Sequence, residues 1–296
     1  MISIIIVSYN VPELLINCIE SVENTGQTSN YEIIVVDNAS KDNAKDIVLE
    51  RFPKVVWIQN QQNLGFASAV NIGLMQAHGD IFVLLNPDSI MNSNALTALE
   101  TFWQSHPDAG IVGGKVLNAD GTIQKQCRRN FPSPSSAFFR LFRLSRLFPK
   151  CELANAYELD PVDLENIHEV DAVAGAFMSF TRDLVELIGM FDEGYFLMGE
   201  DLDFCYRAKL ASKKVFFLPK AVITHYYGAS RQTQPLKSTY HSHMAMIRYF
   251  RKFLKDDHSL ISTGFIYAGI ITHLLLFWFL NLILLAKQKL IYEKNQ

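Results

Sequence analysis

The first 116 residues alternate short apolar runs with segments whose apolar residues recur at helical spacing, and this alternation limits the fold most strongly. The apolar runs are rich in β-branched residues and are bounded by Ser, Asn, Asp and Pro, which is typical of buried strands. Strands are predicted at 2–8, 32–36, 55–59, 81–85 and 110–116, and helices from Pro12 and at 42–51, 66–78 and 95–104. Near-continuous apolar strands between helices indicate an α/β fold, with a mostly parallel sheet covered on both faces.

The middle of the chain has little periodicity. The segment from 118 to about 169 contains four prolines and a basic stretch that runs from Arg128 to Arg146. We interpret it as a long functional excursion without a core of its own. Regular patterns then return, with strands predicted at 170–181 and 214–218 and helices at 182–188, 200–211 and 240–254. Three units are predicted: 1–116, 117–239 and 240–296.

The C-terminal region contains no Asp, Glu, Lys or Arg between His258 and Lys287. Its run 260–286 exceeds the roughly 20 apolar residues that cross a bilayer core. This favours attachment to a membrane, either as a full span or as an interfacial or re-entrant helix, and a helix that binds a partner protein is the alternative. The preceding basic residues Arg248, Arg251 and Lys252 are expected to add about 1 kcal/mol each by attraction to anionic lipid.

Composition excludes several classes of protein. The net charge of −3 argues against nucleic acid as the main partner, and 49% apolar with 19% charged residues excludes a disordered chain. The four cysteines, Cys18, Cys127, Cys151 and Cys205, form no C-x-x-C pair or Cys/His cluster. This usage suits a reducing cytosol, and the N-terminal run lacks the basic start of a signal peptide.

Polar residues follow three of the predicted strands. The first strand ends in Ser8-Tyr9-Asn10, the second in Asp37-Asn38, and the fourth in Asn86-Pro87-Asp88. Any one of these is an ordinary strand end or helix cap, but ligands of open α/β sheets bind at this edge. Three polar ends at one edge therefore predict a binding site. Neither G-x-G-x-x-G nor G-x-x-x-x-G-K-[ST] is present, which argues against a dehydrogenase-type or P-loop nucleotide site.

Three further features are candidates for chemistry. Asp88 can hold Mg²⁺ or Mn²⁺ together with substrate phosphates; its alternative role, capping the next helix, is available to Ser93. Glu200 and Asp201 open a helix after an apolar stretch, where a carboxylate can abstract a proton. Their alternative role is favourable electrostatics at a helix N-terminus. His225 ends an apolar stretch, and a lone His is more often structural than a ligand.

These residues belong to a set of motifs that resembles a known family. Val7-Ser-Tyr-Asn10, Val35-Val-Asp-Asn-Ala-Ser40, Asn63-Leu-Gly-Phe-Ala67, Leu84-Leu-Asn-Pro-Asp88 and Gly199-Glu-Asp-Leu-Asp203 occur in order and at suitable spacing. Together they resemble the family-2 inverting glycosyltransferases, nearest to the rhamnosyltransferase-like branch that builds bacterial cell-surface polysaccharides. The resemblance covers about residues 1–230 and implies a GT-A fold, in which a nucleotide-binding α/β half is fused to an acceptor-binding half.

The resemblance also implies roles for individual residues. Asp37 should bind the nucleotide base or ribose, Asp88 the metal, and Asp201 should be the catalytic base with Glu200 beside it. His225 matches a His that reaches the metal or the diphosphate. Asn86 stands where the family has the first Asp of Asp-x-Asp, which removes one negative charge. The remaining residues expected to bind the nucleotide sugar are Ser8, Tyr9, Asn10 and Asn63.

The function implied is transfer of one sugar, rhamnose by the resemblance to that branch, from a nucleoside diphosphate to a lipid-linked or glycan acceptor. The Gln-x-x-Arg-Trp motif of processive members is absent. The expected location is the cytoplasmic face of the bacterial inner membrane, with Mg²⁺ or Mn²⁺ as cofactor. Two alternatives stay open: an inactive sugar-nucleotide-binding scaffold, and a nucleotidyltransferase, which would want a Gly-rich basic loop after the first strand.

Overall fold

The structure is a computed structural model that describes residues 1–25, 30–142, 164–226 and 235–294. Within these residues, nine strands form one sheet in the order β3-β2-β1-β4-β10-β6-β11-β5, with β8 also paired to β11. The strands are β1 (Ile2–Ser8), β2 (Tyr31–Asp37), β3 (Val56–Gln59), β4 (Ile81–Leu85), β5 (Ser89–Met91), β6 (Ala109–Leu117), β8 (His168–Glu169), β10 (Phe177–Thr181) and β11 (Lys214–His225).

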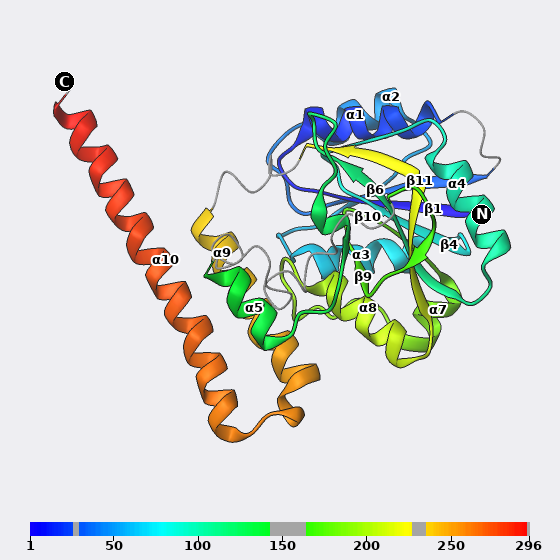
Figure 1. Cartoon of the computed structure of the whole chain (residues 1–296). Helices are drawn as coiled ribbons and strands as arrows, with labels where there is room; N and C mark the ends of the chain where they lie inside the picture. Colours follow the sequence, from blue (N-terminus) through cyan, green and yellow to red (C-terminus); the bar gives the residue numbers. More distant parts are fainter. Residues whose placement is uncertain (26–29, 143–163, 227–234, 295–296) are drawn as a thin grey trace.

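Helices cover both faces of this sheet, as predicted (Figure 1). One face carries α1 (Pro12–Glu23), α2 (Ala44–Arg51) and α4 (Ala95–Ser105); the other carries α3 (Phe66–Gln76), α7 (Arg182–Ile188) and α8 (Glu200–Leu210). The strands supply most of the core, and β1 and the second half of β2 are buried throughout. Burial on both faces explains why these strands read as continuous apolar runs.

The sheet as a whole is mixed, so the prediction of a mostly parallel sheet holds only for part of it. Strands β3, β2, β1 and β4 are parallel, as are β6 and β11. Strand β10 lies between β4 and β6 and is antiparallel to both. The chain leaves β6 at the carboxyl edge of the sheet and returns through β10 from that same edge. No crossover helix is then needed, and the antiparallel direction follows.

The region after β6 differs from its prediction in detail. The segment predicted as one strand at 170–181 is two strands, β9 (Ala172–Val173) and β10, and β9 pairs with β7 (Arg128–Arg129) in a separate small sheet. A 3₁₀ turn, Lys125–Cys127, precedes β7. Strand β11 extends beyond 218 to His225, and β5 was not predicted. Cys151 and Arg146 lie outside the described residues.

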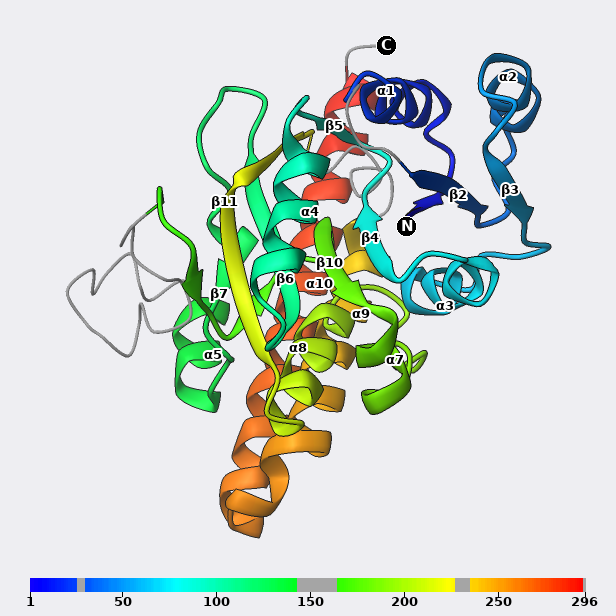
Figure 2. The same cartoon turned by 90° about the vertical axis from the view of Figure 1, so that its right-hand side faces the viewer.

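The C-terminal helices pack beside the α/β unit. Helix α9 (Pro235–Tyr249) continues as a π-helical turn, Phe250–Leu254, and a 3₁₀ turn, Lys255–Asp257, before α10 (Leu260–Lys294). Figures 1 and 2 show α10 running along α9 and near α5 (Pro134–Leu141). The helices are antiparallel, because Phe250 contacts Tyr267 and His243 contacts His273. Residues 260–283 are long and apolar enough to cross a membrane, and only 6% of that window is buried.

Candidate active site

A cavity of about 1220 Å³ opens at the carboxyl edge of the parallel strands. It lies between this edge, the N-terminus of α8 and the helices α5, α9 and α10. Seven of the predicted site residues line it: Tyr9, Asn63, Asn86, Asp88, Glu200, Asp201 and His225. The three others, Ser8, Asn10 and Asp37, do not line this cavity. The tertiary structure therefore brings the metal, base and most nucleotide-sugar candidates to one place.

The three predicted residues outside the cavity build the loops next to it. Ser8 is buried at the end of β1, and the Asn10 backbone N–H donates to Ser40 Oγ at 2.8 Å. The carboxylate of Asp37 accepts hydrogen bonds from the Ser40 backbone N–H at 2.9 Å and from Gln59 Nε2 at 2.6 Å. Asp37 is therefore internally bonded in this structure, and its contact with the nucleotide stays a prediction.

Asp88 and His225 form the metal candidate. Asp88 Oδ1 lies 3.0 Å from His225 Nε2, and Asn86 Nδ2 lies 3.2 Å from the same nitrogen. Asp88 and His225 are both buried at the edge of the sheet. Their proximity has a simple topological cause: β5 follows Asp88 directly and pairs antiparallel with the end of β11, which places Ser89 opposite His225.

Gln124 determines which nitrogen of His225 carries the proton. Its side-chain Nε2 donates to the backbone carbonyl of His225 at 3.0 Å, so its Oε1 must face Nδ1 of the same residue, 3.1 Å away. An oxygen acceptor at this position requires the proton to lie on Nδ1. In the neutral ring Nε2 is then the nitrogen that can bind a metal, as in metal-binding histidines that are held by a second partner. Gln124 lies in the segment without periodicity, so no sequence signal indicated it.

The chemistry of this pair fits a divalent cation. The Asp88 carboxylate oxygen and the His225 imidazole nitrogen lie 3.0 Å apart, and both are atoms that coordinate divalent cations. Among the described residues no group of three or more His, Cys, Asp and Glu side chains could hold a metal. A site with two protein ligands suits Mg²⁺ or Mn²⁺, which commonly complete their coordination with substrate phosphates and water.

Asp201 faces the cavity from the first turn of α8. Its Oδ2 accepts hydrogen bonds from Arg129 Nη2 at 2.6 Å and from the Gly175 backbone N–H at 3.2 Å, and its Oδ1 accepts one from the Leu202 N–H at 2.8 Å. A carboxylate has about four acceptor sites, so a position on Oδ1 remains for a substrate hydroxyl. Arg129 was interpreted only as part of a basic stretch, and the structure places it inside the site through the pairing of β7 with β9.

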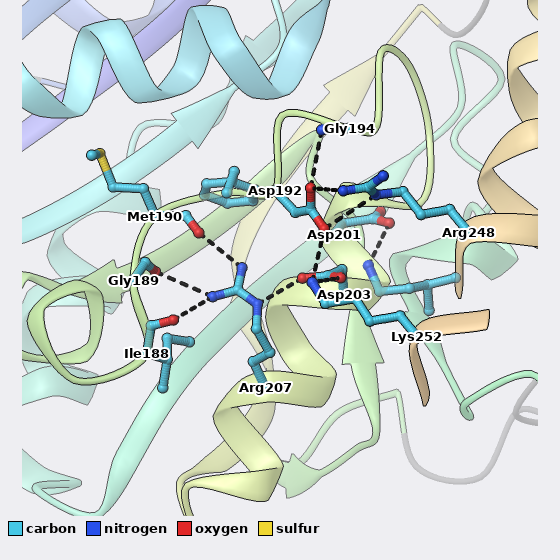
Figure 3. Close-up of polar contacts among 12 residues, drawn as sticks. Ile188, Gly189, Met190, Asp192, Gly194, Asp201, Asp203, Arg207, Arg248 and Lys252 are labelled. Atoms are coloured by element: carbon cyan, nitrogen blue, oxygen red, sulfur yellow. Dashed lines mark hydrogen bonds and ion pairs between the residues drawn. The ribbon is translucent and has the colours of Figure 1, made fainter. Parts of the chain in front are cut away.

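The neighbouring acids of α8 have different surroundings. Glu200 is buried and lines the cavity, so it stays the alternative base. Asp203 is fully buried on the other side of the helix, where it accepts from Arg207 Nε and Lys252 Nζ, each at 2.6 Å (Figure 3). Asp203 therefore points away from Asp201, in line with the angle of about 200° between residues two positions apart on a helix.

Two of the basic residues before α10, Arg248 and Lys252, belong to an ion-pair network. Arg248 and Lys252 both donate to Asp192, at 2.5 Å and 2.8 Å between the charged atoms, and Lys252 also binds Asp203 (Figure 3). Burial alone would raise the pKa of Asp192, but the hydrogen bonds from Arg248 and Lys252 hold this pKa well below its ordinary value. Arg248 and Lys252 therefore have a carboxylate partner within the protein, and Arg251 is exposed. The attraction of these residues to anionic lipid stays a prediction.

The motif Asn63-Leu-Gly-Phe-Ala67 joins the two halves of the site. Gly65 has φ +86°, and a Cβ on it would lie 2.5 Å from the carbonyl oxygen of Phe196. Only glycine permits both the backbone conformation and this approach. The Phe66 N–H donates to the same carbonyl at 2.8 Å, and Asn63 Oδ1 accepts from the Gly65 N–H at 2.9 Å. The loop before Glu200 is thereby held against the N-terminal half of the sheet.

Comparison with known proteins defines the class. The family model Glycosyl transferase family 2 matches residues 3–157. The chain therefore belongs to glycosyl transferase family 2, which confirms the resemblance found in its motifs.

Two curated relatives and one solved structure are similar to this chain at 26% identity or less. The low-salt glycan biosynthesis hexosyltransferase Agl10 of Haloferax volcanii is 26% identical over 70% of this chain and 61% of its own length. The N-acetylglucosaminyl-diphospho-decaprenol L-rhamnosyltransferase of Mycobacterium tuberculosis is 25% identical over 77% of this chain and 75% of its own. The mannosyltransferase PcManGT of Pyrobaculum calidifontis, solved with GDP-Man and Mn²⁺, superposes with a TM-score of 0.55 at 16% identity, over 92% of this chain and 73% of its own. This likeness confirms the GT-A fold.

Proposed function

We propose that this protein is a metal-dependent inverting glycosyltransferase that moves one sugar from a nucleoside diphosphate to a lipid-linked acceptor. One observation carries the proposal: the Asp201 carboxylate and the Asp88–His225 pair line the same cavity. A base for the acceptor and ligands for the donor's diphosphate are the two requirements of such a transfer. Family membership and fold support the same reaction class.

In the proposed reaction the acceptor hydroxyl donates its hydrogen bond to Asp201 Oδ1. Its oxygen attacks the anomeric carbon from the side opposite the diphosphate, the bond from that carbon to the diphosphate oxygen breaks, and Asp201 takes the proton. Arg129, Gly175 and Leu202 hold the carboxylate in one orientation through three N–H groups. A positioned base contributes typically 10²–10⁴-fold to such a step.

Asp88 and His225 are the proposed ligands of Mg²⁺ or Mn²⁺, and Gln124 keeps the Nε2 lone pair of His225 available. When bound, the metal supplies positive charge against the leaving diphosphate. Support comes from the donor set itself and from structural neighbours solved with Mn²⁺.

The proposed acceptor is a sugar on a lipid diphosphate, and the proposed donor is a nucleoside diphosphate hexose such as rhamnose. These assignments rest on the relative named as acting on N-acetylglucosaminyl-diphospho-decaprenol. The Haloferax relative, named as a hexosyltransferase of glycan biosynthesis, is consistent with an acceptor of the same kind. Both assignments are proposals for this chain.

We also propose that α10 attaches the protein to the cytoplasmic face of a bacterial membrane and lies along its surface. Residues 260–283 are apolar and largely unburied. They pack antiparallel to α9, which carries Lys237 and Arg248. A span in this arrangement would bring both charges to bilayer depth at considerable cost.

Two measurements test the attachment. Deletion of residues 258–296 should move the protein from the membrane fraction to the soluble fraction. A Glu293→Cys variant in intact spheroplasts should resist a membrane-impermeant maleimide and react only after lysis. Reaction in intact cells would show that the helix spans, and a truncated protein that still pelleted through a salt wash would place the anchor elsewhere.

The activity is tested with a panel of nucleoside diphosphate sugars, each with Mn²⁺ or Mg²⁺. One donor should raise the melting temperature by mass action, and the same donor should support transfer to a lipid-linked acceptor. Binding without transfer or donor hydrolysis would favour the inactive scaffold. Formation of a nucleotide sugar from a nucleoside triphosphate and a sugar phosphate would indicate a nucleotidyltransferase.

A further inference from the structure

The cavity extends beyond the site described above into an apolar arm. Its walls are three helices: α5 with the residues just before it, α9 with its π-helical turn, and the first part of α10. The apolar residues of the arm include Phe138, Phe142, Met246, Phe250, Phe265 and Ile266. None of these contacts is needed to bind a nucleotide or a metal. The arm is continuous with the part of the cavity that contains Asp88 and Asp201.

Helix α10 contributes one face to the arm. The face consists of residues that recur at three and four positions: Ile261, Ser262, Phe265, Ile266, Gly269 and Ile270. Along the helix it extends about 14 Å, at 1.5 Å per residue. Ile261 and Phe265 are 74% and 75% exposed although they line the cavity, so the arm opens on the apolar side of the molecule.

Glycine marks open space on this face. A Cβ built on Gly269 meets no atom within 4 Å, and the same holds for Gly264, which does not line the cavity. The whole cavity, at about 1220 Å³, exceeds the roughly 300–1,000 Å³ that is usual for one small ligand. There is room for a second molecule beside the donor.

A cation also lies in the wall of the cavity. Lys237 lines the cavity, and its Nζ lies 5.6 Å from the centre of the Phe196 ring, in the loop that leads to Glu200 and Asp201. In the described part of the chain no carboxylate forms an ion pair with Lys237, whereas Arg248 and Lys252 are both paired. A lysine without an acid partner beside an apolar channel is suited to a phosphate group on a hydrocarbon chain.

We propose that the arm binds the hydrocarbon chain of the acceptor, an isoprenoid diphosphate, with Lys237 against its phosphates. This inference deepens the proposed function and rests on it for the identity of the occupant. A chain lying between α5, α9 and α10 would enter sideways from the membrane surface and place the head group at Asp201. Burial of apolar chain against these side chains supplies affinity, about 25 cal/mol per Å² removed from water.

The test is photolabelling of the full-length protein with a photoreactive farnesyl diphosphate. In the wild type, cross-links should map to α5, α9 and α10, and unlabelled farnesyl diphosphate should compete. Gly269→Leu should fill the arm and lower labelling about tenfold or more, which corresponds to about 1.4 kcal/mol. Gly264→Leu is the matched control, because it makes the same change on the same helix outside the cavity and should label like the wild type.

Two further measurements can refute the proposal. Lys237→Met should weaken labelling by farnesyl diphosphate but leave labelling by photoreactive farnesol unchanged. A photoreactive phosphatidylcholine that labels the arm equally well would show a bulk-lipid site and overturn the proposal, as would equal effects of the two glycine variants or cross-links outside the three helices. Labelling needs no sugar transfer, so a failure of the proposed activity would be seen separately, in the transfer assay.

Discussion

The cavity and the ion-pair network lie on opposite sides of α8, and each uses acids from the same short motif. On the cavity side, Asp201 is held by three N–H groups and keeps an acceptor site towards the open space. On the other side, Asp203 is fully buried and shared between Arg207 and Lys252. Two residues along one helix thus separate an acid suited to chemistry from an acid that ties the catalytic helix to the segment before α10. Surroundings, rather than residue type, decide the role.

The largest effect is expected from Asp201→Asn. The amide cannot take the acceptor's proton, so turnover should fall by 10²–10⁴-fold, the typical contribution of a positioned base. Donor and Mn²⁺ affinity, measured by calorimetry, should stay nearly unchanged because Asp88 and His225 are intact. Glu200→Gln is the comparison variant and should be milder. If Asp201→Asn keeps near-normal turnover while Glu200→Gln is inactive, the catalytic base is Glu200 and not Asp201.

Asp203→Ala should show the opposite pattern. The substitution removes the carboxylate partner of Arg207 and leaves Lys252 with Asp192 alone. Removing one partner of a buried ion pair typically costs about 3–5 kcal/mol. The free energy of unfolding should fall by this amount in urea titrations, while turnover of the folded fraction at low temperature stays within a few-fold of wild type. A variant with wild-type stability would contradict the structural role of Asp203.

Gln124→Leu should lower the affinity for Mn²⁺ although both proposed metal ligands, Asp88 and His225, are unchanged. Loss of the acceptor at Nδ1 releases the tautomer and the ring orientation of His225, and loss of such a partner typically costs 10–100-fold in metal affinity. Mn²⁺ binding is measured directly by electron paramagnetic resonance, in the absence of any acceptor. Gln126→Leu is the control, because Gln126 also lines the cavity but forms no described bond with His225. Equal affinities in the two variants would remove Gln124 from this role.

The smallest effect concerns the contact of α9 with α10. Burial lowers the pKa of His243, whose Nδ1 bonds to the Thr239 carbonyl and whose Nε2 lies 2.9 Å from His273 Nδ1. The unfolded chain therefore binds a proton more readily than the folded one, and stability should fall as pH drops below the ordinary His value of about 6.5. Melting temperatures at about pH 7 and about pH 5 measure this. A His243→Leu variant with an unchanged pH dependence would exclude His243 as the cause.

Much of the fold could be predicted because its signals are local. Buried strands require continuous apolar runs, and the predicted strands at 2–8 and 81–85 match β1 and β4 to the residue. The direction of β10 could not be predicted in this way. An apolar run has the same pattern whether the chain enters the strand from the carboxyl edge or the amino edge of the sheet. Short strands such as β5 also carry too few residues for a pattern, although β5 brings Asp88 to His225.

The sequence by itself determined the family, the strand ends and the candidate residues Asp88, Asp201 and His225. Only the tertiary structure decided their partners. Arg129 lies 72 residues before Asp201 in the chain, and Gln124 lies 101 residues before His225. Local periodicity reports which faces are buried, but an ion pair or a hydrogen bond across such separations depends on how the whole chain returns to the sheet. For the same reason the pairing of Arg248 and Lys252 with Asp192 could not be predicted from the local pattern.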